Sequence, residues 1–439
     1  MPQQTAALRC SQKPPFILFV FGAIAFSLLA WFPSMVMVAN GSGDGLFDLV
    51  LFGKTCRPMG LEMGWPYNSQ QLGVSVGAWA PAATLYVVQS AACEISLLTR
   101  LPVLSVFIIL GVSLTILLGF WACRYIGCGR FSSLAAATAM ATAPCAFSRI
   151  AHIMLSQLWP VLPATACACL ILVGGRRGNE IARPAGSLQD GSLLGLMAFT
   201  GQEYYAVFGT LVVLCCWLVR VLDWLVLTGR HRPGLRLQIA RLSNVSSVAA
   251  GFTIIQVIIL GSKQLLWHIP SSALHAAQRY PAEQFLYGFW PFTLLTSPLI
   301  NDRLIERINS AFIPLREAFL SSGSLMVPIG LALAYKIIKD YRMQPQSHTG
   351  PIIESGMQAM VKSGNNRLMP ASSCVLLISV SLALVVMTSG GLGTLFALYG
   401  SPQLRALNRF LPYVYAPAVL TIALWMEVQT RRMFKSAES

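Results

Sequence analysis

Charged residues are scarce in this chain. Only 11% of its 439 residues are Asp, Glu, Lys or Arg, whereas 55% are hydrophobic, and the mean hydropathy is +0.63. A water-soluble globular protein of this composition would expose large apolar patches. The composition therefore excludes an ordinary soluble protein and indicates a polytopic membrane protein.

Several other classes lack their signatures here. None of the 11 cysteines has the paired spacing of a zinc site, and those beside apolar runs are interpreted as small packing residues. The basic residues form no folded surface of the kind that binds nucleic acid. No internal repeat occurs, and no matched pair of interrupted helices, which would favour a transporter.

Apolar runs are what the chain has in abundance. A transmembrane helix needs about 20 apolar residues, and we predict about ten such helices in one all-α integral membrane domain, residues 1–439. The first run follows Arg9 and Lys13 and is interpreted as a retained anchor rather than a signal peptide. The runs lie at 16–39, 102–122, 131–148, 154–174, 204–227, 245–265, 319–338, 371–396 and 410–429, with a shorter one at 192–202.

The distribution of positive charge predicts an orientation. If the N-terminus is inside, the inner segments hold 20 of the 31 Lys and Arg residues, as the positive-inside rule requires. Both termini of this multi-pass protein are then predicted to be cytoplasmic. The net charge of +15 then faces anionic membrane lipid rather than nucleic acid.

Two outer segments are long, 40–100 and 264–318. In the first we predict short interfacial helices, one at 45–54 and one at 80–98, and the second is interpreted as interfacial or re-entrant because Pro291 and Pro298 break its apolar stretch. Cys56 and Cys93 both fall in the first segment, where a disulfide is one option. The inner loop 339–367 is polar and weakly patterned, so we predict that it is mobile.

Two carboxylates follow the first apolar run. Asp44 and Asp48 are four residues apart, so on a helix they share one face and repel each other unless a cation or hydrogen-bond donors lie between them. Partial burial at a membrane surface would raise the pKa of such a carboxylate toward that of a general base. Asp44 is alternatively the cap of a helix that begins at Gly45.

Cationic and polar side chains lie at other predicted outer ends. A guanidinium fork matches phosphate oxygens, and a pair of arginines one helical turn apart, Arg405 and Arg409, suits a lipid phosphate. The alternatives are interfacial anchoring and a salt bridge with Glu283. The candidate set for binding lipid phosphate or substrate is Arg149, His152, Arg279, Glu283, Arg405, Asn408 and Arg409.

The segment TGQEYYAVFG contains one more acid and two tyrosines. Glu203 follows a short apolar run and is predicted to face the outer cavity, either as a functional residue or in an ion pair. Tyr204 and Tyr205 are predicted to be aromatic residues of the membrane interface.

These segments resemble, in their order and topology, a group of bacterial multispanning sugar transferases of the GT-C glycosyltransferase class, some of which are labelled sugar translocases. The resemblance covers residues 15–425 and is carried by SGDGLFDLVLFGK, SSLAAATAMATAPCAFSRIAHIMLSQLWP, TGQEYYAVFG, RYPAEQFLYGFWPFTLLTSPLINDR and GGLGTLFALYGSPQLRALNRF.

The resemblance implies an enzyme of the bacterial inner (plasma) membrane that uses a polyprenyl-phosphate sugar as donor and a glycan or a lipid as acceptor. It implies that Asp44, in the first outer loop, is the base for the acceptor hydroxyl. Some GT-C enzymes also hold a divalent metal with outer-loop carboxylates, a role open to Asp44 or Asp48, although no ligand spacing in this chain demands a metal or any other cofactor.

Two alternatives to a transferase stay open. One is a translocase that flips lipid-linked sugars, which is disfavoured because few ionisable residues lie within the apolar runs. The other is a non-catalytic partner in polysaccharide assembly. Many GT-C relatives carry a soluble domain after the last span, whereas this chain ends at Ser439, so a shortened or inactive paralogue of the enzyme also stays open.

Overall fold

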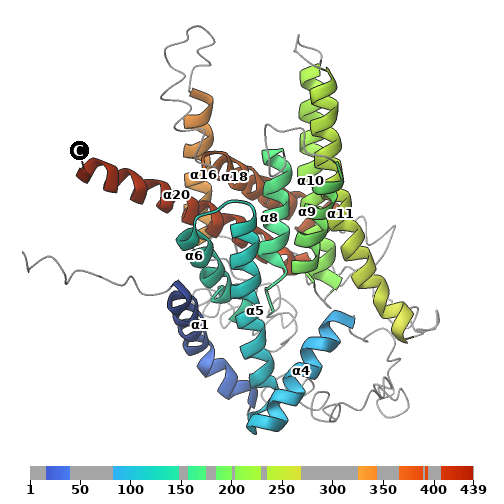
Figure 1. The fold of residues 1–439 in the computed structure, drawn as a ribbon, viewed down its shortest axis with the longest axis vertical. Helices are drawn as coiled ribbons and strands as arrows, with labels where there is room; N and C mark the ends of the chain where they lie inside the picture. Colours follow the sequence, from blue (N-terminus) through green and yellow to red (C-terminus); the bar gives the residue numbers. More distant parts are fainter. Residues whose placement is uncertain are drawn as a thin grey trace, which may run out of the picture.

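A computed structural model of the chain describes residues 16–39, 83–147, 157–174, 184–199, 203–228, 235–267, 325–343, 365–388, 391–393 and 407–438. Within these ranges the protein is helical and contains no β-strand (Figure 1). The elements are α1 (Phe16–Ala39), α4 (Ala83–Thr99), α5 (Val103–Tyr125), α6 (Arg130–Ala141), α7 (Pro144–Phe147), α8 (Val161–Val173), α9 (Pro184–Met197), α10 (Glu203–Thr228), α11 (Leu235–Trp267), α16 (Met326–Met343), α18 (Asn365–Leu382), the π-helical turn η3 (Ala383–Met387), the 3₁₀ turn η4 (Leu407–Phe410) and α20 (Pro412–Glu438).

A short helix without a polar face, α8, lies at the centre of the bundle. Every residue from Val161 to Ile171 is buried, which is the expected state of a helix that is apolar all round. Its sequence ATACAC consists of small residues, so neighbouring helices can approach it closely. Helices α5, α9, α10, α11, α18 and α20 all pack against α8.

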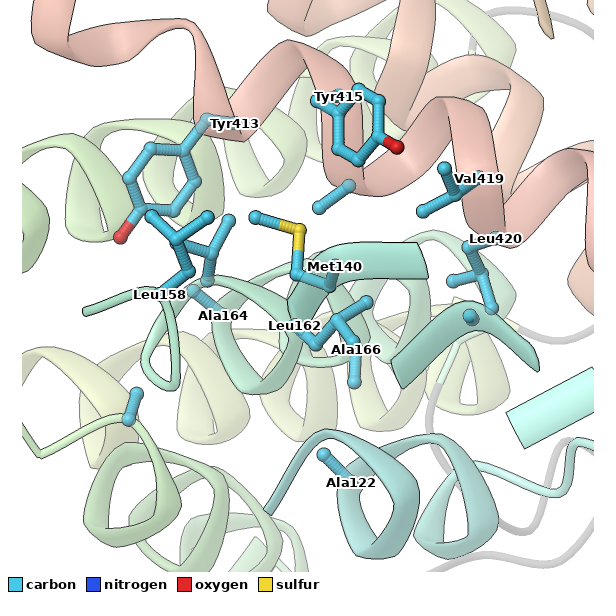
Figure 2. Packing of buried hydrophobic residues seen from close by; sticks show 14 of the residues in the cluster. Ala122, Met140, Leu158, Leu162, Ala164, Ala166, Tyr413, Tyr415, Val419 and Leu420 are labelled. Carbon is cyan, nitrogen blue, oxygen red and sulfur yellow. The ribbon is translucent and has the colours of Figure 1, made fainter. Parts of the chain in front are cut away.

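Side chains from three helices form one layer of this core. Figure 2 shows Met140 of α6 between Leu162 of α8 and Tyr415 of α20, with further buried residues on either side. The Tyr415 hydroxyl donates a hydrogen bond to the Ala139 carbonyl over 3.3 Å. Helices α6, α8 and α20, distant in the sequence, are therefore joined by direct side-chain packing.

Helices α9 and α11 cross at very close range. Small residues recur every four positions on α9, at Ser187, Gly191 and Gly195, as in the small-xxx-small pattern of membrane helices. A Cβ atom added at Gly191 would lie 2.0 Å from the Val248 carbonyl oxygen of α11. The backbones touch here, so the crossing requires glycine.

In the described part of the chain, five helices are long and apolar enough to cross a membrane: Phe16–Pro33, Val103–Tyr125, Tyr204–Leu225, Ile239–Gly261 and Arg367–Met387. Helices α6, α8 and α9 contain 12, 13 and 14 residues. At 1.5 Å per residue each is about 18–21 Å long, less than the roughly 30 Å of bilayer hydrocarbon. The all-α membrane architecture is thus supported by five helices, and the prediction of about ten spans is not confirmed.

Helices occur in all ten predicted apolar runs, but several boundaries were wrong. The run 131–148 is not one helix, because α6 ends at Ala141 and the separate short helix α7 begins at Pro144. In the run 371–396 the continuous helix is interrupted, because the π-helical turn η3 ends at Met387 and the backbone of Thr388 is extended. The loop predicted to be mobile, 339–367, is helical at both ends, since α16 extends to Met343 and α18 begins at Asn365.

Helix α4 confirms the second helix predicted in the first long outer segment. It forms a hairpin with α5 through Arg100, whose φ of +60° is the left-handed conformation of a tight turn. Cys93 of α4 is disulfide-bonded, whereas the other cysteines that the structure describes are free thiols. Cys56 lies outside the described residues, so its pairing with Cys93 stays a prediction, as does the first interfacial helix.

Replacing Gly191 by Ala should destabilise the protein by about 1–3 kcal/mol, because the added methyl group meets the α11 backbone and forces the two helices apart. Thermal unfolding of the purified protein in detergent measures this. The control is Gly186→Ala on the same helix, where an added Cβ meets no atom within 4 Å. Equal unfolding temperatures for the two variants would contradict the close crossing.

Candidate functional site

An arginine stacked on a tyrosine marks the end of the bundle at which α10 and α20 begin. The guanidinium carbon of Arg409, in η4, lies 4.3 Å from the centre of the Tyr204 ring, in the first turn of α10. Both side chains are half-buried. A cation over an aromatic face at this distance is attracted by the ring's quadrupole and is held in one orientation.

Buried aromatic residues hold this pair in place. Phe410 meets Phe208 edge to face, with ring centres 5.4 Å apart, and lies 5.8 Å from Tyr413. The exposed fraction of each of these three side chains is only 1%. We call Tyr204, Phe208, Phe410 and Tyr413 the aromatic platform. Because Phe410 is locked into it, the backbone of its neighbour Arg409 has little freedom to move.

A hydrogen bond ties the platform to α10. The Tyr413 hydroxyl donates to the Tyr205 carbonyl over 2.5 Å. The lack of a side chain at Gly209 makes room for Tyr413, since an added Cβ would lie 2.8 Å from the Tyr413 oxygen and 3.2 Å from the Cβ atom of Ala164 in α8. Tyr413 of the platform is therefore packed close to Gly209 of α10 and to the central helix α8.

Two further segments belong to this end of the bundle: the residues just before α8, and the π-helical turn η3. Trp159, just before α8, donates its Nε1–H to the Phe199 carbonyl beyond the end of α9, over 2.5 Å. The π-helical turn η3 packs beside η4, and such turns recur at functional sites. One packed end of the bundle is therefore built from the turn before α8, the residues after α9, the start of α10 and the turns η3 and η4.

Among the sequence-predicted site residues, the structure describes the side chain of Arg409. Asn408 lies in η4, and its side chain is outside the described part. Arg405 is also outside it, and the described end of the segment, 407–410, is a 3₁₀ turn rather than α-helix. The geometry expected for the Arg405–Arg409 pair therefore stays a prediction. Also outside the described residues are Asp44, Asp48, Arg149, His152, Arg279 and Glu283.

The two tyrosines of TGQEYYAVFG differ in environment. Both were interpreted as aromatic residues of the membrane interface, but Tyr205 is buried in the protein, where its carbonyl accepts the bond from Tyr413. Tyr204 is half-buried, and its ring forms the cation–π contact with Arg409. Sequence reasoning missed the contact between Tyr204 and Arg409 because about 200 positions separate the two residues. The one sequence feature that pointed to it was the pair of adjacent tyrosines at a predicted outer helix end.

A small cavity lies deeper in the bundle. Its volume is about 10 Å³, and its lining includes Trp31, Thr115, Met140 and Gln157. That is about the space of one water molecule, far below the volume of a sugar. Within the described ranges no group of three or more His, Cys, Asp or Glu side chains is placed to hold a metal ion.

Comparison with known proteins adds no family to this description: no family model matches the chain, and no curated protein matches its sequence. The described residues define its class, an all-α protein in which five helices are candidates to span a membrane and an arginine stacks on a tyrosine at one end of the bundle.

A double-mutant cycle tests the stacked pair. Tyr204→Leu and Arg409→Met should show a coupling free energy of about 0.5–1 kcal/mol, because either change alone removes the cation–π contact. Unfolding free energies of the single and double variants in lipid nanodiscs supply the cycle. Tyr204→Phe keeps the ring and serves as the control. Additive effects of the two substitutions would show that the ring and the guanidinium do not interact.

Proposed function

We propose that the protein is a GT-C-type glycosyltransferase that moves a sugar from a polyprenyl-phosphate donor to a glycan or lipid acceptor at the outer, periplasmic face of the plasma membrane. The observation that carries this proposal is the half-buried Arg409 guanidinium, fixed on the aromatic platform at a helix-bundle end. About ten transmembrane helices, with both termini cytoplasmic, belong to the same proposal.

A guanidinium in this position is suited to a lipid phosphate. Its planar fork can bond two phosphate oxygens at once. A donor whose polyprenyl chain stays in the bilayer would deliver its phosphate at this level. Arg405 and Asn408 are proposed to act beside Arg409.

The chemistry follows from a base on one side of the sugar and cations on the other. Asp44 accepts the proton of the acceptor hydroxyl while the oxygen of that hydroxyl forms a bond to the anomeric carbon of the donor sugar. The bond from that carbon to the phosphate oxygen breaks, and polyprenyl phosphate leaves with the electron pair. Arg409 stabilises the negative charge that develops on the leaving oxygen, so catalysis rests on positioning and charge stabilisation. Asp48, Arg149, His152, Arg279 and Glu283 are proposed to complete the pocket.

The disulfide of Cys93 supports the proposed orientation. Disulfides persist in oxidising compartments such as the bacterial periplasm and are rare in the cytosol. Helix α4, which carries Cys93, belongs to the first long segment predicted to be outside. The free thiols that the structure describes lie in the bundle or in the turn after α5.

Replacing Asp44 by Asn should abolish sugar transfer, with a loss of at least about 100-fold, because the amide cannot accept the hydroxyl proton. The assay is release of polyprenyl phosphate from a panel of polyprenyl-phosphate sugars by the purified protein. The control is Asp223→Asn, which removes an exposed carboxylate that is paired with Arg220 over 3.0 Å, and it should keep full activity.

The same reconstituted protein separates transfer from the other functions. Full transfer by the Asp44→Asn variant would remove the assigned base. Exchange of the donor between leaflets without release of polyprenyl phosphate would indicate a translocase. If folded and inserted protein shows neither sugar transfer nor leaflet exchange, the result would indicate a non-catalytic assembly partner.

Arg409→Gln should raise the KM for the lipid-linked donor by about 10- to 100-fold, because the lost bonds to phosphate are charge-assisted. Arg409→Lys keeps the charge without the fork and should give an intermediate value. Initial rates at varied donor concentration provide the measurement. Arg241→Gln, on the exposed surface of α11, is the matched control, and an unchanged KM in Arg409→Gln would contradict phosphate binding at this residue.

A further inference from the structure

The last part of α20 leaves the bundle. Residues 412–421 are buried, as are Ala423 and Leu424, whereas the described side chains from Thr430 onward are all exposed. In Figure 1 the C-terminal end of this helix, drawn in dark red, projects sideways beyond the other helices. We call residues 425–438 the α20 overhang.

Apolar and basic side chains occupy different faces of the overhang. Met426, Met433 and Phe434 have exposed fractions of 57%, 63% and 69%. Their spacing, i, i+7 and i+8, puts them on one side of a helix with 3.6 residues per turn. The exposed Arg431 and Arg432 fall on the remaining circumference. A helix with an apolar face and arginines opposite is typical of one that lies in a membrane interface.

A buried carboxylate fixes where the overhang begins. Glu427, whose side chain is only 12% exposed, accepts hydrogen bonds from the Gly129 N–H over 3.2 Å and from the Ser132 hydroxyl, at the start of α6. Arg431, one turn further along α20, pairs with the other oxygen of the same carboxylate. A carboxylate is favourable at a helix N-terminus, so this junction holds the overhang in a set direction.

The start of α6 has interfacial character of its own. Arg130 lies 5.8 Å from the centre of the Phe16 ring, and the exposed Phe131 packs edge to face against both Phe16 and Phe19 of α1, with ring centres 5.9 Å apart. Exposed phenylalanine rings favour hydrocarbon, and arginine side chains near helix ends extend their charge toward the headgroups. The Glu427 junction therefore places the overhang beside a surface of the same kind.

We propose that the overhang lies on the membrane surface, with Met426, Met433 and Phe434 at the boundary of the acyl chains and Arg432 on anionic phospholipid headgroups. Its charge is complementary to anionic lipid. Three apolar side chains are too few for a stable interface with a second copy of the chain, which takes roughly 800 Å² on each partner. The proposal is independent of the transferase activity. Because α20 is one continuous helix, the proposal also means that the predicted run 410–429 is not one of the membrane spans.

Fluorine NMR on the full chain tests this docking. Trifluoromethyl-phenylalanine is placed at Phe434 by codon suppression, and the protein is reconstituted in nanodiscs of phosphatidylcholine with or without phosphatidylglycerol. With phosphatidylglycerol, spin-labelled lipid should broaden the fluorine signal, and a soluble gadolinium chelate should not. One arginine near an anionic surface favours the docked state by about 5-fold, so without phosphatidylglycerol the access of the chelate should increase.

Charge reversal at one arginine supplies the second arm. Arg432→Glu changes the local charge by two and should expose the probe to the chelate even in anionic nanodiscs, while leaving the Glu427 junction intact. Lys339→Glu, an equal change at an exposed position of α16, should leave the probe docked. A probe that the chelate reaches in wild-type protein in anionic nanodiscs would overturn the proposal. Equal protection in both lipids and in Arg432→Glu would overturn its dependence on anionic lipid.

Discussion

The structure depends on the burial of one short helix made of small side chains. Helix α8 has no polar face, and its Ala and Cys residues let helices from both halves of the chain pack directly against it. In lipid there is little hydrophobic driving force between helices, so close packing of small residues is a main source of association. The same rule operates at the crossing of α9 and α11, where Gly191 brings two backbones into contact.

This packing also determines where chemistry can occur. In the part of the bundle that the structure describes, charged side chains occur mainly near helix ends, and the larger buried side chains are apolar or aromatic. Helices α8, α10 and α20 bring Tyr204, Phe410 and Tyr413 together at one end, so Arg409 rests on a rigid base rather than on a loop alone. At the α6 end, Glu427 joins α20 to α6 and directs the overhang. The apolar core thereby positions two basic sites of different character.

The sequence was sufficient for the class of fold and for most helices. Long apolar runs predicted α1, α5 and α10 to within a few residues, because length and hydropathy are local properties. Helices α6 and α8 were predicted as full-length spans, but their small residues are covered by longer helices and need not match the bilayer. Hydropathy cannot make this distinction, since it does not show whether a residue faces lipid or protein.

The candidate site was predictable in one part. Arg409 was selected because arginine suits phosphate at a helix end, and that choice of residue type is local. Its contact with Tyr204 and the burial of Tyr205 depend on how α10 meets η4, which no sequence spacing encodes. Convergence of Asp44, His152 and Arg279 with Arg409 is a long-range property of the same kind and stays a prediction.

Photo-crosslinking tests the central claim most directly, that a lipid phosphate binds where Arg409 stands on the aromatic platform. A polyprenyl phosphate with a diazirine next to its phosphate is added to the reconstituted protein. The mixture is irradiated, and the adducts are mapped by mass spectrometry. The account predicts adducts in η4, at the start of α10 and in the segment around Asp44, all suppressed by unlabelled polyprenyl phosphate. Competable adducts confined to the opposite helix ends, such as the start of α6 or the end of α16, would contradict it.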